Sequence, residues 1–167
     1  VSVTIWRHGQ AGSAATDRER ELTGAGTDDV GFGCQQFHEV CHERGLPHPE
    51  LILHSSWVRT TQTADIIAAA FSHADIRPAA ALIPGSGPAE VDSLLTEVLA
   101  CSPCPSHLVL VSHQPLVSRL ADYYLGDPGK TPSLSPGALV SLQLDVAARD
   151  CGELLFWALP PSYEAHV

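Results

Sequence analysis

The chain of 167 residues carries 19 acidic and 9 basic side chains, which gives a formal net charge of −10. This excess of negative charge argues against nonspecific binding to nucleic acid or to an anionic membrane surface. Hydrophobic residues make up 44% of the chain, and the longest apolar runs are far shorter than the ~20 residues of a membrane-spanning helix. The composition is that of a globular protein, and the length predicts one domain covering residues 1–167.

Cysteine usage gives an expectation about the compartment. The chain has 5 cysteines and shows no basic and apolar leader of the kind that directs secretion. An odd number of cysteines without a secretory signal is typical of free thiols in a reducing environment. We therefore expect a cytoplasmic protein, and the short chain favours a monomer.

Strand-like and helix-like segments alternate along the chain. Strands rich in β-branched, leucine and aromatic residues are predicted at 1–6, 51–54, 107–112, 138–144 and 154–158, with a weaker one at 76–83. Apolar residues at three- and four-residue spacings predict helices at 24–44, 57–71, 88–100 and 115–125. This alternation indicates a three-layer α/β/α sandwich with a mostly parallel central sheet. The last two strands lack a helix between them, so we expect them to form a hairpin.

Polar side chains follow three of the predicted strands. The first strand runs into Arg7 and His8, the second is followed closely by Arg59, and the strand at 107–112 by His113. In open α/β sheets, ligands bind beyond the carboxyl ends of the strands. We therefore expect two histidines and two arginines to meet on one rim of the sheet.

These residue types suit the binding and transfer of a phosphoryl group. Two nearby arginines lower the pKa of His8 by charge repulsion, and a neutral imidazole is what a nitrogen nucleophile requires. Arg7 and Arg59 carry planar donors that match phosphate oxygens, and His113 can add a further hydrogen bond. Such a cluster offers positioning and charge neutralisation without a metal.

The residues next to this cluster carry local predictions. Gly9 permits a positive φ or a close approach of the backbone to a ligand. Ser55 or Ser56 is the expected N-cap of the helix that carries Arg59. Trp57 lies beside that arginine on the same rim, and we expect it to line the substrate-binding surface.

Four stretches in order along the chain resemble the histidine phosphatase superfamily. They are Arg7-His8-Gly9, the segment SSWVRTTQTA around Arg59, the segment VSHQP around His113, and RELTGAG, which begins at Arg20. The last stretch is similar to an element of the SixA-type phosphohistidine phosphatases. The resemblance spans residues 3 to about 158, and the fold it implies is phosphoglycerate mutase-like.

The resemblance also implies roles for individual residues. His8 would be the nucleophile that transiently carries the phosphoryl group, and Arg7, Arg59 and His113 would form the phosphate pocket. Arg20 would contact the phosphate or the substrate. The implied substrate is a phosphohistidine on a protein, a histidine-containing phosphotransfer domain of a two-component relay in signal transduction. No cofactor and no metal ion is implied.

A general acid is not evident in the sequence. Larger relatives protonate an alkoxide leaving group with a carboxylate near the pocket, and only Asp17 and Glu90 are candidates in this chain. An imidazole leaves more easily than an alkoxide because its pKa is close to ~6.5. The lack of an acid therefore favours a phosphohistidine substrate over a phosphate ester.

Three alternatives remain open at this stage. The first is a small-molecule phosphomonoesterase or mutase of the same superfamily, and the second is a phosphate-recognition module without catalysis. The third is a metal site on the predicted first helix, formed by Cys34, His38, Cys41 and His42. This third alternative is weakened because Cys34 and Cys41 fit the apolar stripe of that helix, and one helix cannot easily close a tetrahedral site.

Overall fold

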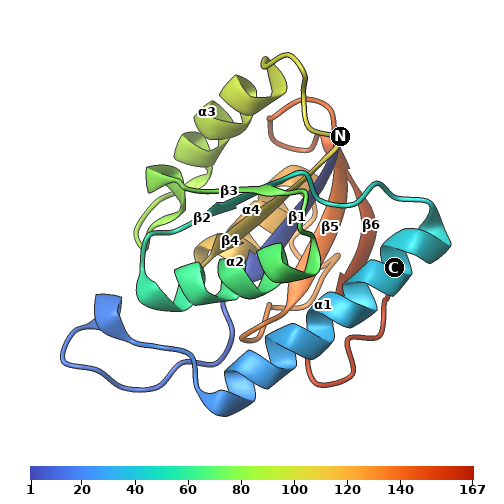
Figure 1. Ribbon diagram of the computed structural model, residues 1–167. Helices are drawn as coiled ribbons and strands as arrows, with labels where there is room; N and C mark the ends of the chain where they lie inside the picture. Colours follow the sequence, from blue (N-terminus) through green and yellow to red (C-terminus); the bar gives the residue numbers. More distant parts are fainter.

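A six-stranded sheet forms the middle of the protein, and the computed structural model describes all 167 residues (Figure 1). The strands are β1 (Ser2–Arg7), β2 (Leu51–His54), β3 (Asp75–Pro78), β4 (His107–Ser112), β5 (Leu139–Leu144) and β6 (Gly152–Ala158). Their order across the sheet is β3-β2-β4-β1-β5-β6. The first four in this order are parallel, and β5 and β6 pair antiparallel as the predicted hairpin.

Four helices cover the two faces of this sheet. They are α1 (Gly24–Arg44), α2 (Val58–Ala70), α3 (Pro88–Leu99) and α4 (Leu116–Leu125), and two short 3-10 turns lie at Asp17–Glu19 and Ala80–Leu82. One core cluster packs α3 and α4 against the sheet, and a second packs α1 and α2 against the opposite face. The predicted three-layer sandwich is thus confirmed.

Alternation along the central strand β1 explains the two cores. Val3 and Ile5 belong to the α3 and α4 side, whereas Trp6 belongs to the α1 and α2 side, where its ring meets Phe37 edge-on. Side chains point to opposite faces at successive strand positions, so a strand covered by helices on both faces buries polar and apolar side chains alike. Thr4 is therefore fully buried in β1, and its hydroxyl has buried hydrogen-bonding partners on the neighbouring strands.

The first helix begins and ends where capping chemistry requires. The Thr23 side chain accepts a hydrogen bond from the Gly26 amide at 2.9 Å, and Gly45 adopts a left-handed conformation, with a φ of 65°, just past the end. A hydroxyl at the N-cap and a glycine beyond the last turn are the preferred residues at these positions. These caps fix the start of α1 beside the loop that follows β1.

The weaker strand prediction at 76–83 is only partly correct. The strand β3 ends at Pro78, and a 3-10 turn takes over two residues later. β3 is an edge strand with all four residues exposed, and a proline at its end cannot donate to a further ladder. The apolar run after Pro78 therefore does not continue the strand, and most of it lies in the turn.

None of the four helices combines the length and the apolar stretch needed to cross a bilayer. All five cysteines are free, as predicted.

Candidate active site

The parallel pairing of β1 with β4 brings the two histidines together. Arg7 lies opposite Ser112 in the register, so His8 and His113 are the first residues beyond the two strands. The His8 amide donates to the Ser112 carbonyl at 3.1 Å, and the two imidazole centroids are 5.3 Å apart. Both rings are buried, with 7% of His8 and 3% of His113 exposed.

The neighbouring strand β2 leads into the helix that carries Arg59. This helix begins at Val58, and its N-cap is Trp57, whose side chain makes no capping hydrogen bond. The prediction that Ser55 or Ser56 caps the helix is therefore wrong. The Ser55 hydroxyl lies 2.8 Å from Nε2 of His113 and accepts from the Trp57 amide at 3.3 Å, so it links the segment before the helix to the site.

The glycine after His8 is required by close packing. A Cβ atom on Gly9 would lie 2.8 Å from a methyl group of Val30 in α1, and a Cβ on Gly26 would overlap the Gln10 carbonyl. The chain can leave β1 against the start of α1 only with glycine on both sides of the contact. The positive φ that Gly9 permits is not observed, and the close approach is to Val30 of the protein itself, whereas the predicted approach was to a ligand. The matching role of Gly26 has no distinct signal in the sequence.

The hydrogen bonds of His8 define its tautomer. Nδ1 lies 2.7 Å from the Gly9 carbonyl oxygen, which can only accept, so Nδ1 carries the hydrogen. Nε2 therefore has a free lone pair, and it accepts from Nε of Arg59 at 3.2 Å. Burial is the largest cause that lowers the pKa of His8 to about 4, and the charges of Arg59 and Arg7 lower it further. The predicted direction is right, but burial contributes more than the arginines.

Arg59 is held on three sides. Only 5% of it is exposed, and besides His8 it contacts one residue of the loop after β1. Nη1 donates to the backbone carbonyl of Asp17 at 2.7 Å, and Nη2 donates to the carboxylate of the same residue at 3.2 Å. The guanidinium is thus fixed against Nε2 of His8 by a single acidic residue.

Arg7 and His113 each present a buried nitrogen without a partner. Arg7 donates through Nη1 to the Leu134 carbonyl at 2.9 Å, but its Nε has no hydrogen-bond acceptor. Nδ1 of His113 also has no hydrogen-bond partner. Burial and the charge of Arg59 lower the pKa of Arg7, and burial is the largest cause that lowers the pKa of His113 to about 3. Buried polar atoms are nearly always paired, so these nitrogens suit an anionic ligand.

The other predicted binding residues lie around this centre. Arg20 donates to the Asp17 carboxylate at 3.1 Å and to the Gly12 carbonyl at 2.8 Å, and it makes no hydrogen bond to the histidines. Trp57 is half-buried, with its ring edge-on to His113 at 6.2 Å between centroids. The guanidinium of Arg18 lies 4.8 Å from the centre of the Trp57 ring. The contact of Arg18 with Trp57 was not predicted, because Arg18 lies in a run of mixed charges that does not indicate which side chain each residue contacts.

The two candidate acids occupy different places. Glu90 accepts from the Gly87 amide at 3.0 Å at the start of α3, and it makes no hydrogen bond to the residues at the rim. Asp17 lies at the rim, but its hydrogen bonds to Arg20 and Arg59 lower the pKa of its carboxyl group. Asp17 is therefore ionised near pH 7 and has no proton to give to a leaving group.

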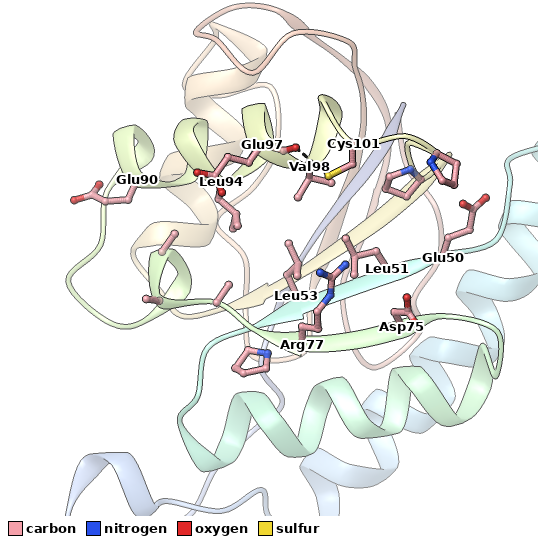
Figure 2. Close-up of a pocket in the computed structure, with 16 residues that line it drawn as sticks. Glu50, Leu51, Leu53, Asp75, Arg77, Glu90, Leu94, Glu97, Val98 and Cys101 are labelled. Atoms are coloured by element: carbon pink, nitrogen blue, oxygen red, sulfur yellow. Dashed lines mark hydrogen bonds between the residues drawn. The ribbon is translucent and has the colours of Figure 1, made fainter.

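A sizeable cavity of the protein lies away from this rim. It has a volume of about 630 Å³ and opens between β3 and α3, where Arg77, Leu53 and Leu94 are among the lining residues (Figure 2). Neither histidine of the rim lines it. The candidate site is therefore identified by the arginine and histidine side chains that meet at the rim of the sheet, and not by the volume of a cavity.

The proposed metal ligands on the first helix do not form a site. Cys34 and Cys41 lie in the core around Phe37, where burial raises the pKa of each thiol to about 12. The structure contains no group of three or more His, Cys, Asp or Glu side chains arranged to bind a metal ion.

Comparison with known proteins gives matches among solved structures only. No protein-family model matches the chain. No curated protein sequence matches it either. The structure of the protein histidine phosphatase SixA complexed with tungstate has a TM-score of 0.77 at 22% identity, covering 98% of this chain and 100% of that chain.

Two further solved structures share the fold. A SixA protein from Nakamurella multipartitia matches with a TM-score of 0.71 at 25% identity, covering 95% of each chain. A mycobacterial glucosyl-3-phosphoglycerate phosphatase matches with a TM-score of 0.65 at 16% identity, covering 92% of this chain and 96% of that chain. The chain therefore has the fold of these solved structures, which is the phosphoglycerate mutase-like fold of the histidine phosphatase superfamily.

Proposed function

We propose that this protein is a phosphohistidine phosphatase that acts without a metal ion through a phosphorylated His8. Its proposed substrate is a phosphohistidine on a histidine-containing phosphotransfer domain of a two-component relay, and we infer that it acts as a cytoplasmic monomer. The observation that carries the proposal is the Nε2 atom of His8, which is neutral, faces away from its own backbone and lies 3.2 Å from a buried arginine.

The arrangement supports a two-step transfer. In the first step the His8 Nε2 lone pair forms a bond to phosphorus, and the bond from phosphorus to the substrate nitrogen breaks. In the second step a water oxygen attacks phosphorus, the bond to Nε2 breaks, and phosphate leaves with the neutral imidazole restored. Arg7, Arg59 and the unpartnered Nδ1 of His113 can donate to the phosphate oxygens while charge shifts among them.

The lack of a suitable acid favours cleavage of a phosphorus–nitrogen bond. A phosphohistidine whose other ring nitrogen is protonated releases a neutral imidazole, so no side chain has to supply a proton. Glu90 makes no hydrogen bond to the rim, and Asp17 is held ionised between two arginines. An alkoxide leaving group would find no proton donor of this kind.

The proposal extends to the surface around the pocket. Arg18, Arg20 and Trp57 lie at the mouth of the site in a protein with a net charge of −10. Arginine and tryptophan side chains are common contacts at protein interfaces, so these residues suit the binding of a phosphorylated protein partner. Trp57 and Arg20 are thus proposed to contact the substrate.

The direct test uses a phosphorylated histidine-phosphotransfer domain in the presence of excess chelator. We expect the wild type to release phosphate and His8→Ala to be inactive. Labelled substrate should also leave an acid-labile phosphate on the wild type and none on His8→Ala. Equal rates for the two proteins would show that His8 is not the nucleophile.

The mycobacterial glucosyl-3-phosphoglycerate phosphatase that shares the fold motivates a second arm of this test. Glucosyl-3-phosphoglycerate and other phosphate esters should be hydrolysed slowly, because an alkoxide needs a proton. Faster turnover of an ester than of phosphohistidine would instead favour the small-molecule phosphomonoesterase. Binding of tungstate or phosphate without any turnover would favour a recognition module.

A further inference from the structure

Asp17 is not part of the predicted phosphate pocket, but it forms hydrogen bonds with the guanidinium of Arg59, which is. Its carboxylate lies 3.2 Å from Nη2 of Arg59 and 3.1 Å from Nη1 of Arg20, and its carbonyl oxygen accepts from Nη1 of Arg59 at 2.7 Å. The acidic side chain is 60% exposed, whereas that of Arg59 is only 6% exposed. A carboxylate on the open side of the pocket thus binds the arginine that a phosphate would need.

The contact between His8 and Arg59 must break when the nucleophile reacts. Nε2 of His8 uses its lone pair to accept from Arg59, and the same lone pair has to form the bond to phosphorus. Arg59 must therefore move away from Nε2 or turn its donors onto the phosphate oxygens. Because two other nitrogen atoms of Arg59 are bound to Asp17, this movement also disturbs the contacts with Asp17.

We propose that Asp17 is an internal ligand of the phosphate pocket, which holds Arg59 against His8 until the phosphoryl group displaces its carboxylate. The inference rests on the proposed function of this pocket and adds a residue that sets its affinity. A competing internal anion lowers the apparent affinity for phosphate, and it returns to Arg59 when the product leaves. Asp17 is thus a positioning residue that favours product release over retention.

The loop around Asp17 is built for such an exchange. Asp17 begins a 3-10 turn of three residues, none of which is buried. Arg20 is fixed independently by its Nε, which donates to the Gly12 carbonyl at 2.8 Å. When the carboxylate leaves Arg59 it can remain bound to Arg20, so displacement does not strand the negative charge in solvent.

The experiment is a titration of tungstate by calorimetry into the wild type, Asp17→Asn, Asp17→Glu and Glu19→Gln. Glu19 is the matched control, because it lies in the same turn with the same charge and makes no ion pair. We expect Asp17→Asn to bind tungstate about 3- to 10-fold more tightly, since exposed ion pairs have modest strength and the affinity scales with the competent fraction. Asp17→Glu should stay near the wild type, and Glu19→Gln should change by less than about 2-fold.

Two outcomes would overturn the inference. Unchanged or weaker tungstate binding by Asp17→Asn would show that the carboxylate does not compete. Equal tightening in Glu19→Gln would show that only the net charge matters. Inhibition of phosphohistidine hydrolysis by inorganic phosphate provides a second readout, and we expect it to strengthen in Asp17→Asn by the same factor as tungstate binding.

The binding measurement separates this inference from the proposed function. Tighter binding by Asp17→Asn in a protein that hydrolyses nothing would support the internal ligand and refute the phosphatase. If the wild type hydrolyses phosphohistidine but Asp17→Asn binds tungstate no more tightly, the phosphatase proposal would be supported and the internal ligand refuted. A selective loss of ester hydrolysis in Asp17→Asn without tighter binding would identify Asp17 as a proton donor and overturn the inference.

Discussion

The two ends of the central strands contain histidines with almost the same hydrogen bonds and very different surroundings. His107, at the start of β4, donates through Nδ1 to the Pro47 carbonyl at 2.7 Å and accepts at Nε2 from the Thr4 hydroxyl at 2.8 Å. His8, at the far end of β1, also places Nδ1 2.7 Å from a carbonyl, but its Nε2 faces Arg59. Burial is the largest cause that lowers the pKa of both rings, each to about 4.

This similarity shows that a lowered histidine pKa is not by itself the sign of a catalytic site. His107 is saturated by neutral partners inside the core, so its lone pair has a structural use only. At the other end, the lone pair of His8 accepts from a charged donor, the guanidinium of Arg59. A functional site is indicated by what the second nitrogen faces, and not by the shift alone.

The largest contrast is expected from removing each ring in turn. His8→Gln should lower the rate of phosphohistidine hydrolysis by at least ~1,000-fold because the nucleophile is lost, with little change in folding. His107→Gln should leave the rate per folded molecule intact and lower the free energy of unfolding by about 1–3 kcal/mol. Steady-state kinetics and thermal melting check the pair, and loss of activity in folded His107→Gln would erase the contrast.

The next effect concerns the guanidinium that distinguishes the two ends. Arg59→Lys should lower kcat/KM by about 100-fold, because an ammonium lacks the planar fork of donors that matches two phosphate oxygens. Arg44→Lys is the control, since Arg44 donates to a backbone carbonyl on the surface and lies far from the rim. A lysine that restores most of the activity would show that charge matters here and geometry does not.

Lowering the pH should affect stability in the same way through the histidines at both strand ends, but it should affect activity differently at the two ends. In the unfolded chain these histidines have an ordinary pKa near ~6.5, so on acidification the unfolded state binds protons before the folded state does. Their contribution to the free energy of unfolding is therefore complete above about pH 6.5 and is lost as the pH drops toward their pKa values in the folded protein. Each of His8, His107 and His113 should contribute up to about 1.4 kcal/mol per pH unit in this window. The His107→Gln variant should melt with a shallower dependence on pH.

The rate per folded molecule should not fall as the pH is lowered through 6.5. His8 has a pKa of about 4, so it remains neutral down to about pH 5. The measurement is kcat/KM against pH, corrected for the folded fraction. A drop in rate centred near pH 6.5 would mean that His8 titrates like an exposed histidine.

The smallest effect is expected at the mouth of the site. Trp57→Leu should raise KM for a phosphorylated protein about 3- to 10-fold and leave a small phosphoramidate substrate unaffected. Arg18→Gln removes the cation above the same ring and should act in the same direction. If KM rises equally for the protein and for the small phosphoramidate, Trp57 supports the pocket through His113 and does not contact the protein substrate.

Most of the fold could be predicted because its elements have strong local signals. The helices at 24–44 and 88–100 were predicted with boundaries that differ from those of the structure by at most one residue. Pro88 and Gly45 mark a helix start and a helix end, which hydrophobic spacing alone does not. The edge strand β3 was predicted least well, because an exposed strand has no buried side to impose a pattern.

The centre of the site was predictable because parallel strands end at a common edge. That rule was enough to bring His8 and His113 together, since the register aligns Arg7 with Ser112. The contacts of Asp17, Arg18 and Arg20 were not predictable, because they depend on the path of an irregular loop. Ser55 was assigned to the wrong partner for a related reason, since a hydroxyl can serve either a helix end or a nearby ring.

The register between β1 and β4 also has a consequence for folding. His8 emerges early during synthesis and His113 much later, so the two rings can meet only after the segments between them have formed the sheet. An oxyanion that needs both rings therefore binds the native state and not the unfolded chain. Tungstate at 100 times its dissociation constant should add about 2.7 kcal/mol to the free energy of unfolding of the whole protein.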